Sequence, residues 1–503
     1  MKVYLLHPNR DFVFDTHPSS AIRMPTLFAD LELPTVAAAM AGQDELIATV
    51  VQRVFAGGVQ NDVDTVLYRQ AVLRDCLTNV PLIERLAKLA LEAGERRQRQ
   101  WLGLFSRSPS GILYEAVDLL NMLLDIFAEL KQLVRAHQPQ FESDGFQALF
   151  TRINHELTPD YFNQVRHDLG QLKFHDGTVI SAQLGARNEG HNYTLRRTNN
   201  QPGNFFQRLF TRGPARYAFR LDPRDEAGHQ ALSELTNRGL NTAANALAQS
   251  ADHMMSFLTI LRTELAFYRG CVNLHRALSD RGVPLCFPIP TPAGTGRCQC
   301  TDLRDAGLAL RIGSEVRPNS INANNKNMIV ITGANQGGKS TFLRAMGAAQ
   351  VMMQAGLFVP ASHFEADVAP AIFTHYKRQE DRTMKRGKFD EELSRLSDIV
   401  DGLTPAAILL LNESFSATNE IEGSQIADQV IQALLEAGVR VWFVTHLYQF
   451  AHAAQQHYHD TALFLRAKRQ DDGTRTFEMH PGEPLATSFA NDLYHQIFDP
   501  AHG

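Results

Sequence analysis

The chain has 503 residues, a formal charge of 49 − 54 = −5, 44% hydrophobic residues and 20% charged residues. This balance is typical of folded globular proteins of about three domains, and it excludes disordered, collagen-like and small disulfide-stapled classes of protein. Five cysteines in so long a chain predict free thiols and a reducing compartment. No apolar run approaches the roughly 18–20 residues of a membrane span, so we expect a cytoplasmic protein with no membrane contact.

The first half of the chain carries mainly helical patterns. Up to about residue 170, apolar residues recur at i, i+3, i+4 and i+7, as in residues 112–136. Short alternating runs between Asp-Gly and Asn-Glu-Gly turns then predict a small β-rich insertion at 172–222. A helical pattern returns over about 225–280, and a proline-rich connector follows. We therefore expect a helical region over residues 1–283 that contains the β-rich insertion.

Beyond the connector, residues 284–503 alternate between strand and helix patterns, which is typical of an α/β domain with a mainly parallel sheet. The segment GANQGGKS fits G-x-x-x-x-G-K-[ST] between an apolar run and a helical pattern. Its glycines let backbone amides face phosphate oxygens, and the helix that follows adds positive charge. Lys339 supplies charge for the β/γ-phosphates, and the Ser340 hydroxyl suits Mg²⁺. The predicted nucleotide-binding residues are Gly333, Ala334, Asn335, Gln336, Gly337, Gly338, Lys339, Ser340 and Thr341.

Two further apolar runs end in side chains that suit hydrolysis. The run AAILLLNE ends in Asn412 and Glu413, where a carboxylate is placed to orient and deprotonate a water. Asn412 stands where aspartate is usual, and its amide oxygen lacks the charge that attracts the ion. The run RVWFVTH ends in His446, which is placed to sense the γ-phosphate. The candidate catalytic residues are Lys339, Glu413 and His446, and the candidate magnesium ligands are Ser340, Asn412 and Glu413.

The β-rich insertion is rich in arginine. From Gly190 to Arg220 there are six arginines and no aspartate or glutamate, and aromatic residues alternate with the arginines. Arginines and aromatics together suit contact with a phosphate backbone and with exposed bases. The alternative is an exposed insertion whose aromatics pack on its own small sheet. The candidate DNA-binding residues are Arg196, Arg197, Arg208, Arg212 and Arg216.

Taken together, the C-terminal motifs resemble the MutS family of DNA mismatch-repair ATPases over about 170 positions. TGANQGGKSTFLR is similar to the family's phosphate loop, FDEELSRLSDIV to its signature-loop helix, and LLLNESFSATNEIEG to its Walker B strand and dimer-interface loop. FVTHLYQFA is similar to the switch-histidine segment, and LYRQAVLRDCLTN to the start of the helical core. The resemblance implies an ABC-like ATPase domain that dimerises head to tail and sandwiches each ATP between two protomers.

The resemblance also implies further site residues and shows departures from the family. Asn319 is expected near the nucleotide, and Val316 to Asn319 replace the family's adenine-stacking aromatic. Gly387 and Lys388 stand where the family has Ser-Thr. We expect a shortened, divergent member without the N-terminal mismatch-recognition and connector domains. The implied contacts with the partner's nucleotide are Arg386, Gly387, Lys388, Thr418 and Asn419.

Three functions remain open from the sequence. The first is a Mg²⁺- and ATP-dependent homodimer whose nucleotide state changes its grip on DNA in mismatch repair or another DNA repair or recombination process. Its turnover is expected to be slow because Asn412 replaces the usual aspartate. The second is a dimeric nucleotide-binding scaffold with little turnover. The third is a P-loop ATPase that acts on a protein partner and not on nucleic acid.

Overall fold

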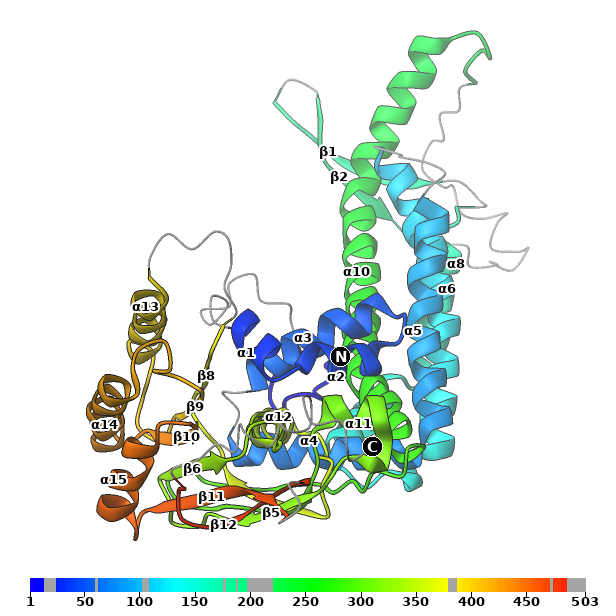
Figure 1. Cartoon of the computed structure of the whole chain (residues 1–503). Helices are drawn as coiled ribbons and strands as arrows, with labels where there is room; N and C mark the ends of the chain where they lie inside the picture. Colours follow the sequence, from blue (N-terminus) through cyan, green and yellow to red (C-terminus); the bar gives the residue numbers. More distant parts are fainter. Residues whose placement is uncertain are drawn as a thin grey trace, which may run out of the picture. The chain divides into compact units, whose positions relative to one another are not determined.

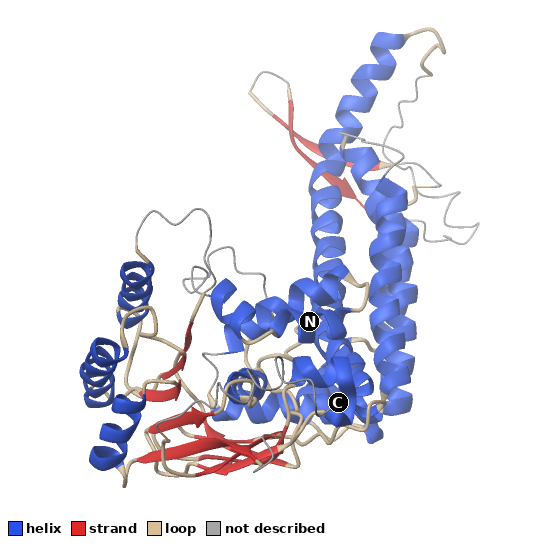
Figure 2. Cartoon of the chain, viewed as in Figure 1, coloured by secondary structure: helices blue, strands red, loops and turns tan. Residues whose placement is uncertain are grey.

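The computed structural model describes residues 1–12, 24–58, 62–101, 108–174, 178–186, 189–196, 220–378, 387–470 and 474–485. They form two compact units (Figures 1 and 2). The described residues form helices and β-sheets, in agreement with the helical and α/β patterns predicted from the sequence. Among these residues, no helix is long and apolar enough to cross a membrane. The first unit comprises Met1–Val3, Glu84–Phe141 and Gln147–Arg262, and the second comprises Tyr4–Ile83, Glu142–Phe146 and Thr263–Gly503.

The first unit consists of helices and one β-hairpin. Helix α6 begins at Pro109, and the Ser108 hydroxyl accepts a hydrogen bond from the Gly111 N–H, so both ordinary helix-start signals are present. The long helix α10 confirms the helical stretch predicted from about residue 225 to 280. The elements that lie wholly or partly in this unit are α5 (Val80–Trp101), α6 (Pro109–His137), η1 (Gln138–Gln140), α7 (Asp144–Glu156), α8 (Pro159–Gln171), β1 (Val179–Leu184), β2 (Gly190–Arg196) and α10 (Glu226–Ser279).

The hairpin of the first unit packs on its helices through a small apolar cluster. Leu113 of α6 and Leu240 of α10 are buried there, and Leu195 of β2 packs against them. Strands β1 and β2 are antiparallel, with a bulge between Ser181 and Gln183. The predicted β-rich insertion therefore contains one two-stranded sheet, and its residues 197–219 lie outside the described part of the chain.

The second unit contains two sheets. In the six-stranded sheet, of order β12-β11-β6-β10-β9-β8, all strands but the edge strand β12 run parallel, which confirms the mainly parallel sheet predicted after residue 284. The four-stranded sheet has the order β3-β7-β4-β5. The strands are β3 (Ile289–Thr291), β4 (Cys298–Leu303), β5 (Asn319–Asn322), β6 (Met328–Gly333), β7 (His363–Asp367), β8 (Ile372–Tyr376), β9 (Ile408–Asn412), β10 (Arg440–Val444), β11 (Ala462–Arg469) and β12 (Arg475–Pro481).

Helices cover both faces of the six-stranded sheet. Helices α13, α14 and α15 lie on one face (Figure 1), where buried residues of α14 and α15 share a core cluster with β6, β9 and β10. Helix α12 packs on β9, and a Cβ at Gly347 would come 2.6 Å from Leu410 Cδ2, so a larger residue here would require the leucine side chain to move. The remaining helices of this unit are α1 (Met24–Asp30), α2 (Leu33–Ala41), α3 (Glu45–Gly58), α4 (Val63–Thr78), α11 (Ala306–Ile312), η2 (Gly313–Glu315), α12 (Lys339–Gln354), α13 (Lys388–Val400), α14 (Glu420–Glu436) and α15 (Tyr448–Tyr458).

A buried carboxylate of α10 anchors the N-terminal segment of the second unit. Glu264 is fully buried, and its oxygens accept hydrogen bonds from the N–H groups of Leu5 at 2.6 Å, Leu6 at 3.0 Å and Phe12 at 2.7 Å. The Arg69 guanidinium donates to the Leu6 carbonyl at 2.7 Å. Burial raises the pKa of Glu264 to about 7. The residues near the start of the chain are therefore part of the core of this unit.

Replacing this carboxylate is expected to destabilise the protein strongly. Glu264→Ala leaves buried N–H groups without an acceptor, so we expect the free energy of unfolding to fall by about 2–5 kcal/mol. Urea unfolding followed by circular dichroism measures the change. Glu234→Ala, at an exposed glutamate of the same helix, is the control and should shift stability by less than about 0.5 kcal/mol. Equal unfolding midpoints for the two variants would contradict the proposed anchor.

Candidate functional site

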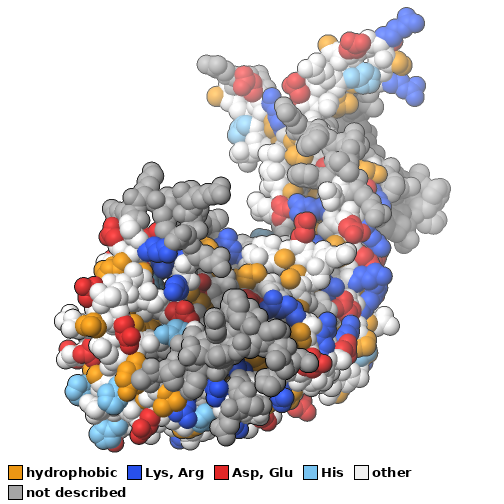
Figure 3. Space-filling view, in the orientation of Figure 1, with side chains coloured by type: hydrophobic (Ala, Val, Ile, Leu, Met, Phe, Trp, Pro, Cys, Tyr) orange, Lys and Arg blue, Asp and Glu red, His pale blue; other side chains and the backbone are white. Residues whose placement is uncertain are grey.

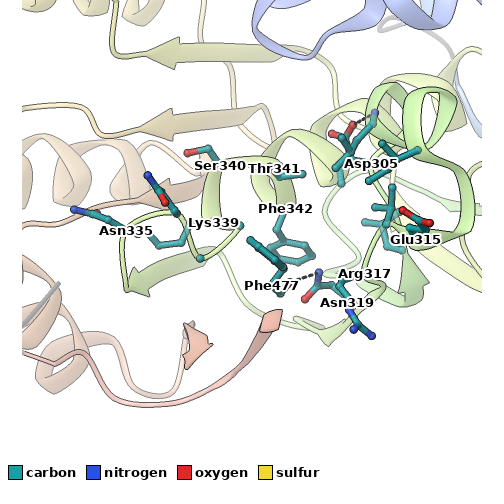
Figure 4. Close-up of a pocket in the computed structure, with 18 of the residues that line it drawn as sticks. Asp305, Glu315, Arg317, Asn319, Asn335, Lys339, Ser340, Thr341, Phe342 and Phe477 are labelled. Atoms are coloured by element: carbon teal, nitrogen blue, oxygen red, sulfur yellow. Dashed lines mark hydrogen bonds between the residues drawn. The ribbon is translucent and has the colours of Figure 1, made fainter. Parts of the chain in front are cut away.

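A pocket of about 410 Å³ opens beside the loop that joins β6 to α12 (Figure 4). The loop forms one wall, α11 and the segment after it form another, and Phe477 of β12 reaches in from a third side. Glu413, which follows β9, also lines the pocket. Residues from four separate parts of the second unit therefore meet here.

The predicted phosphate loop has the backbone that an anion site needs. Gly333 ends β6 with φ 106°, and Gly338 precedes α12 with φ 88°, both in the left-handed region that favours glycine. The first amides of α12 have no acceptor within the helix, and the helix dipole favours negative charge at this end. Residues Asn335 to Thr341 line the pocket, and Gly333 and Ala334 lead into it.

The Lys339 side chain points back into the phosphate loop, although the residue itself begins α12. Its side chain is 5% exposed, and Nζ donates to the carbonyl oxygens of Gly333 at 2.9 Å and Ala334 at 2.8 Å. Burial lowers its pKa to about 8, while the nearby Glu413 acts in the opposite direction. The ammonium thus remains mostly charged at neutral pH and is held ready for an anion by the loop's own carbonyls.

Ser340 and Asn412 are brought together as candidate magnesium ligands. Ser340 is the second residue of α12 and Asn412 ends β9, and the Ser340 hydroxyl donates to Asn412 Oδ1 at 2.8 Å. A hydroxyl and an amide oxygen are neutral oxygen ligands, so the charge at this edge of the sheet comes from Glu413. The donor set fits an ion that takes most of its charge compensation from nucleotide phosphates.

Glu413 and His446 form a hydrogen-bonded pair. Strands β9 and β10 are parallel neighbours, with Asn412 opposite Val444, so the residues that follow them lie at the same edge of the sheet. His446 Nε2 donates to Glu413 Oε1 at 3.0 Å. This bond is the main cause of a pKa of Glu413 below its ordinary value, and Lys377 and Lys339 add to the effect. Glu413 is therefore ionised at neutral pH, as a general base must be.

Phe477 is a pocket residue that our sequence analysis missed. It lies on β12 with its side chain 48% exposed and in the pocket, although the chain between β6 and β12 contains many other elements. Asn319 of β5 holds this strand, because its Nδ2 donates to the Phe477 carbonyl at 3.2 Å and its Oδ1 accepts from the Met479 N–H at 2.6 Å. Both polar atoms of the Asn319 side-chain amide are therefore hydrogen-bonded to the backbone of β12. In the sequence, Phe477 is a lone phenylalanine in the polar segment RTFEMHP, a pattern that does not indicate a pocket residue.

Removing this aromatic ring is expected to weaken nucleotide binding. A base lying against Phe477 would stack on its ring, and such stacking is worth about 1–3 kcal/mol per base. We therefore expect Phe477→Ala to raise the Kd for ATP roughly tenfold or more, while Phe477→Tyr keeps wild-type affinity. Titration with a fluorescent nucleotide analogue measures both values. If alanine and tyrosine variants bind equally well, Phe477 has no role in base binding.

The described residues of the predicted dimer interface lie at two helix starts. Gly387 precedes α13 and is exposed, and Lys388 is the first residue of that helix. Asn419 caps α14 by accepting from the Glu422 N–H, and the Thr418 hydroxyl donates to the Glu422 carboxylate at 2.8 Å. Arg386 lies outside the described residues. Both segments belong to the same unit as the pocket, and their role between protomers stays a prediction.

Little of the predicted DNA-binding set falls within the described part of the chain. Arg196 ends β2, and its Nε donates to the Ser181 hydroxyl of β1 at 2.9 Å. Arg196 is exposed, and Ser181 is half-buried. The other candidates, Arg197, Arg208, Arg212 and Arg216, lie outside the described residues.

Comparison with known proteins gives two matching families. The MutS2 N-terminal domain matches residues 61–281, and MutS domain V matches residues 329–487. A DNA mismatch repair protein MutS from Desulfosudis oleivorans is 29% identical over 182 residues, which cover 33% of this chain and 21% of that protein. A protein named DNA mismatch repair protein MutS 2 from Halobacterium salinarum is 33% identical over 158 residues, or 31% of this chain and 18% of that protein.

A third relative, a DNA mismatch repair protein MutS from Thermotoga sp., is 36% identical over 123 residues, or 24% of this chain and 16% of that protein. The similarity to each of these three proteins thus spans about a fifth of its length or less. The region matched to domain V contains the loop, both strand ends and Phe477, so it carries most of the pocket.

Proposed function

Because this chain belongs to the MutS family, we propose that it is a Mg²⁺-dependent ATPase that acts as a homodimer and changes its grip on DNA with nucleotide state. The observation that carries the proposal is that Lys339, Ser340 and Glu413 line one pocket, with His446 hydrogen-bonded to Glu413. The mismatch-repair names of the relatives support a role in DNA repair.

In this proposal each side chain has one task. The loop amides and Lys339 bind the phosphates, and Phe477 stacks on the base. Glu413 takes a proton from the attacking water, which its depressed pKa allows at neutral pH. His446 holds the carboxylate in place through its bond to Glu413, and it is proposed to respond when phosphate enters. The partner protomer is proposed to contact the nucleotide through Gly387, Lys388, Thr418 and Asn419.

Magnesium fits this site through Ser340 and Asn412. When bound with ATP, the ion neutralises charge on the phosphates that the reaction transfers. Ser340 is the residue proposed to ligate it directly, and Asn412 would accept a hydrogen bond from one of its waters. The missing carboxylate at position 412 lowers the affinity of the site for the ion and favours slow turnover.

Placing a carboxylate at position 412 is expected to lower the Mg²⁺ concentration that ATP hydrolysis requires. We expect Asn412→Asp to lower the Mg²⁺ concentration for half-maximal ATP hydrolysis roughly tenfold, because a charged carboxylate replaces a neutral amide beside the ion. Hydrolysis measured over a magnesium series at saturating ATP gives the value. Ser340→Ala should change it in the opposite direction. An unchanged magnesium requirement in Asn412→Asp would remove this residue from the proposed metal site.

DNA binding is proposed to use the β-rich insertion. The arginine-rich, acid-free stretch from Gly190 to Arg220 and the exposed hairpin support contact with a phosphate backbone. On the visible face of the described residues, basic and acidic side chains are interspersed (Figure 3), so a local contact at the insertion is favoured over a broad basic surface.

The experiment for the proposed function is steady-state ATP hydrolysis at several salt concentrations, with and without duplex, mismatched and branched DNA. We expect ATP hydrolysis to require Mg²⁺. We also expect at least one DNA structure to change the hydrolysis rate, and this effect should weaken as the salt concentration rises. Hydrolysis that no DNA alters at any salt below physiological strength would contradict the DNA part. It would favour the third function, action on a protein partner.

The scaffold function remains as a second candidate because of one observation, the neutral Asn412 at the magnesium edge. It predicts tight ATP binding and ATP-dependent dimerisation with negligible phosphate release. A turnover above roughly 1 per second, within the usual enzyme range, excludes it.

A further inference from the structure

The turn that carries Glu413 has a strained backbone. Glu413 has φ 56° and Phe415 has φ 64°, so two residues with side chains adopt the left-handed region within three positions. The Phe415 side chain is fully buried. Such conformations persist when neighbouring groups hold them, and they are frequent at active sites. The contacts that hold this turn therefore decide where the Glu413 carboxylate lies.

Helix α13 supplies one of these contacts. Glu392 of α13 is 6% exposed, and its Oε1 accepts a hydrogen bond from the Phe415 N–H at 2.5 Å. Burial raises the pKa of this carboxyl group, and the bond to Phe415 acts against that shift. This charge-assisted hydrogen bond from the Phe415 N–H to the Glu392 carboxylate fixes the end of the turn that lies after Glu413.

His375 supplies the second contact. This residue of β8 is 1% exposed, its Nε2 lies 3.1 Å from the Glu392 carbonyl oxygen, and its Nδ1 lies 2.7 Å from the Ser414 hydroxyl. A carbonyl oxygen only accepts, so Nε2 carries the proton and donates. Burial lowers the pKa of His375 to about 4, so the ring is neutral at pH 7 and Nδ1 is an acceptor. The Ser414 hydroxyl also lies 2.9 Å from the His375 carbonyl oxygen, so its single proton serves either Nδ1 or that carbonyl. The ring therefore joins α13 to the middle of the turn.

We propose that Glu392 and His375 are positioning residues that fix the catalytic Glu413 and tie its turn to helix α13. The proposal rests on the proposed ATPase function of the site. Lys388, which is expected to face the partner's nucleotide, lies one helical turn before Glu392 on the same helix. A shift of α13 at a protomer contact would therefore move the turn that carries the general base, through the Glu392–Phe415 and His375–Ser414 bonds.

The test compares substitutions in the full chain that each remove the hydrogen bonds of one side chain. Glu392→Ala removes the acceptor of the Phe415 N–H, Glu392→Gln retains an oxygen acceptor, and Ser414→Ala removes the bonds to the ring and the carbonyl of His375 with little change in volume. Glu391→Ala, at the neighbouring half-exposed glutamate of α13, is the matched control. We expect Glu392→Ala and Ser414→Ala to lower kcat about 10- to 100-fold while the Kd for ATP stays near wild type, since small misplacements of a catalytic group cost this much. Glu392→Gln should recover most of the rate.

Hydrogen exchange of the peptide that covers residues 412–416 is the second readout, and it needs no turnover. We expect faster exchange of this peptide in Glu392→Ala and Ser414→Ala than in Glu391→Ala. If the wild-type chain does not hydrolyse ATP, the proposed function fails, and the exchange rates alone decide whether these residues hold the turn. Exchange and kcat equal to those of Glu391→Ala would overturn the positioning role. A loss of ATP affinity in step with kcat would also overturn it.

Discussion

Glu413→Gln is expected to abolish ATP hydrolysis and to leave ATP binding intact. Glutamine keeps the shape of the side chain and an oxygen that accepts from His446 Nε2, but it cannot take a proton from water. General-base catalysis contributes about 10²–10⁴-fold, so kcat should fall by that factor. Phosphate release at saturating ATP measures kcat, and isothermal titration measures the Kd for ATP.

The exposed Glu436 of α14 offers the matched control for this substitution. Glu436→Gln should hydrolyse ATP at the wild-type rate. The trapped, ATP-bound Glu413→Gln protein should also accumulate as a dimer in size-exclusion chromatography with ATP present. If kcat of Glu413→Gln stays within about twofold of wild type, another group activates the water and Glu413 is not the base.

Lys339→Ala is expected to lose nucleotide binding itself. The ammonium is the buried charge of the phosphate loop, and truncating one partner of a buried charge pair costs about 2–5 kcal/mol. The Kd for ATP should therefore rise by roughly 100-fold or more, with hydrolysis lost as a consequence. Fluorescent nucleotide titration measures the affinity, and thermal unfolding shows whether the fold is retained.

Lys88→Ala, at an exposed lysine of α5, is the control for lost positive charge. It should bind ATP as the wild-type chain does. Lys339→Ala and Glu413→Gln are expected to differ, because the first loses affinity for ATP whereas the second loses only turnover. Nucleotide affinity that survives Lys339→Ala would contradict the assignment of this loop as the phosphate site.

The parts of the site that depend on local sequence were predictable. The phosphate loop follows from the spacing of glycines, Lys339 and Ser340 between a strand and a helix. The meeting of Glu413 with His446 follows from a general property of parallel sheets, in which the carboxyl ends of neighbouring strands share one edge. The roles of these residues stay predictions until they are measured.

Contacts between distant parts of the chain were beyond local patterns. Phe477 reaches the pocket because the antiparallel strand β12 pairs with β11, and Asn319 holds that strand from another sheet. Glu264 binds the N–H of Leu5, which is 259 positions away in the sequence. Periodicity and motif spacing report on neighbours in sequence, so they carry no signal for such pairs. The predicted division at residue 283 follows local pattern alone and stays a prediction.

ATP bound at this pocket is proposed to change the affinity of the chain for DNA. The most direct measurement is the equilibrium affinity for duplex, mismatched and branched DNA, with and without Mg²⁺-ATP, for wild type and Lys339→Ala at several salt concentrations. We expect ATP to change the wild-type affinity for at least one DNA structure by about tenfold, within the usual range of coupling between two sites, and to leave Lys339→Ala unchanged. Identical wild-type affinities with and without ATP would contradict the claim.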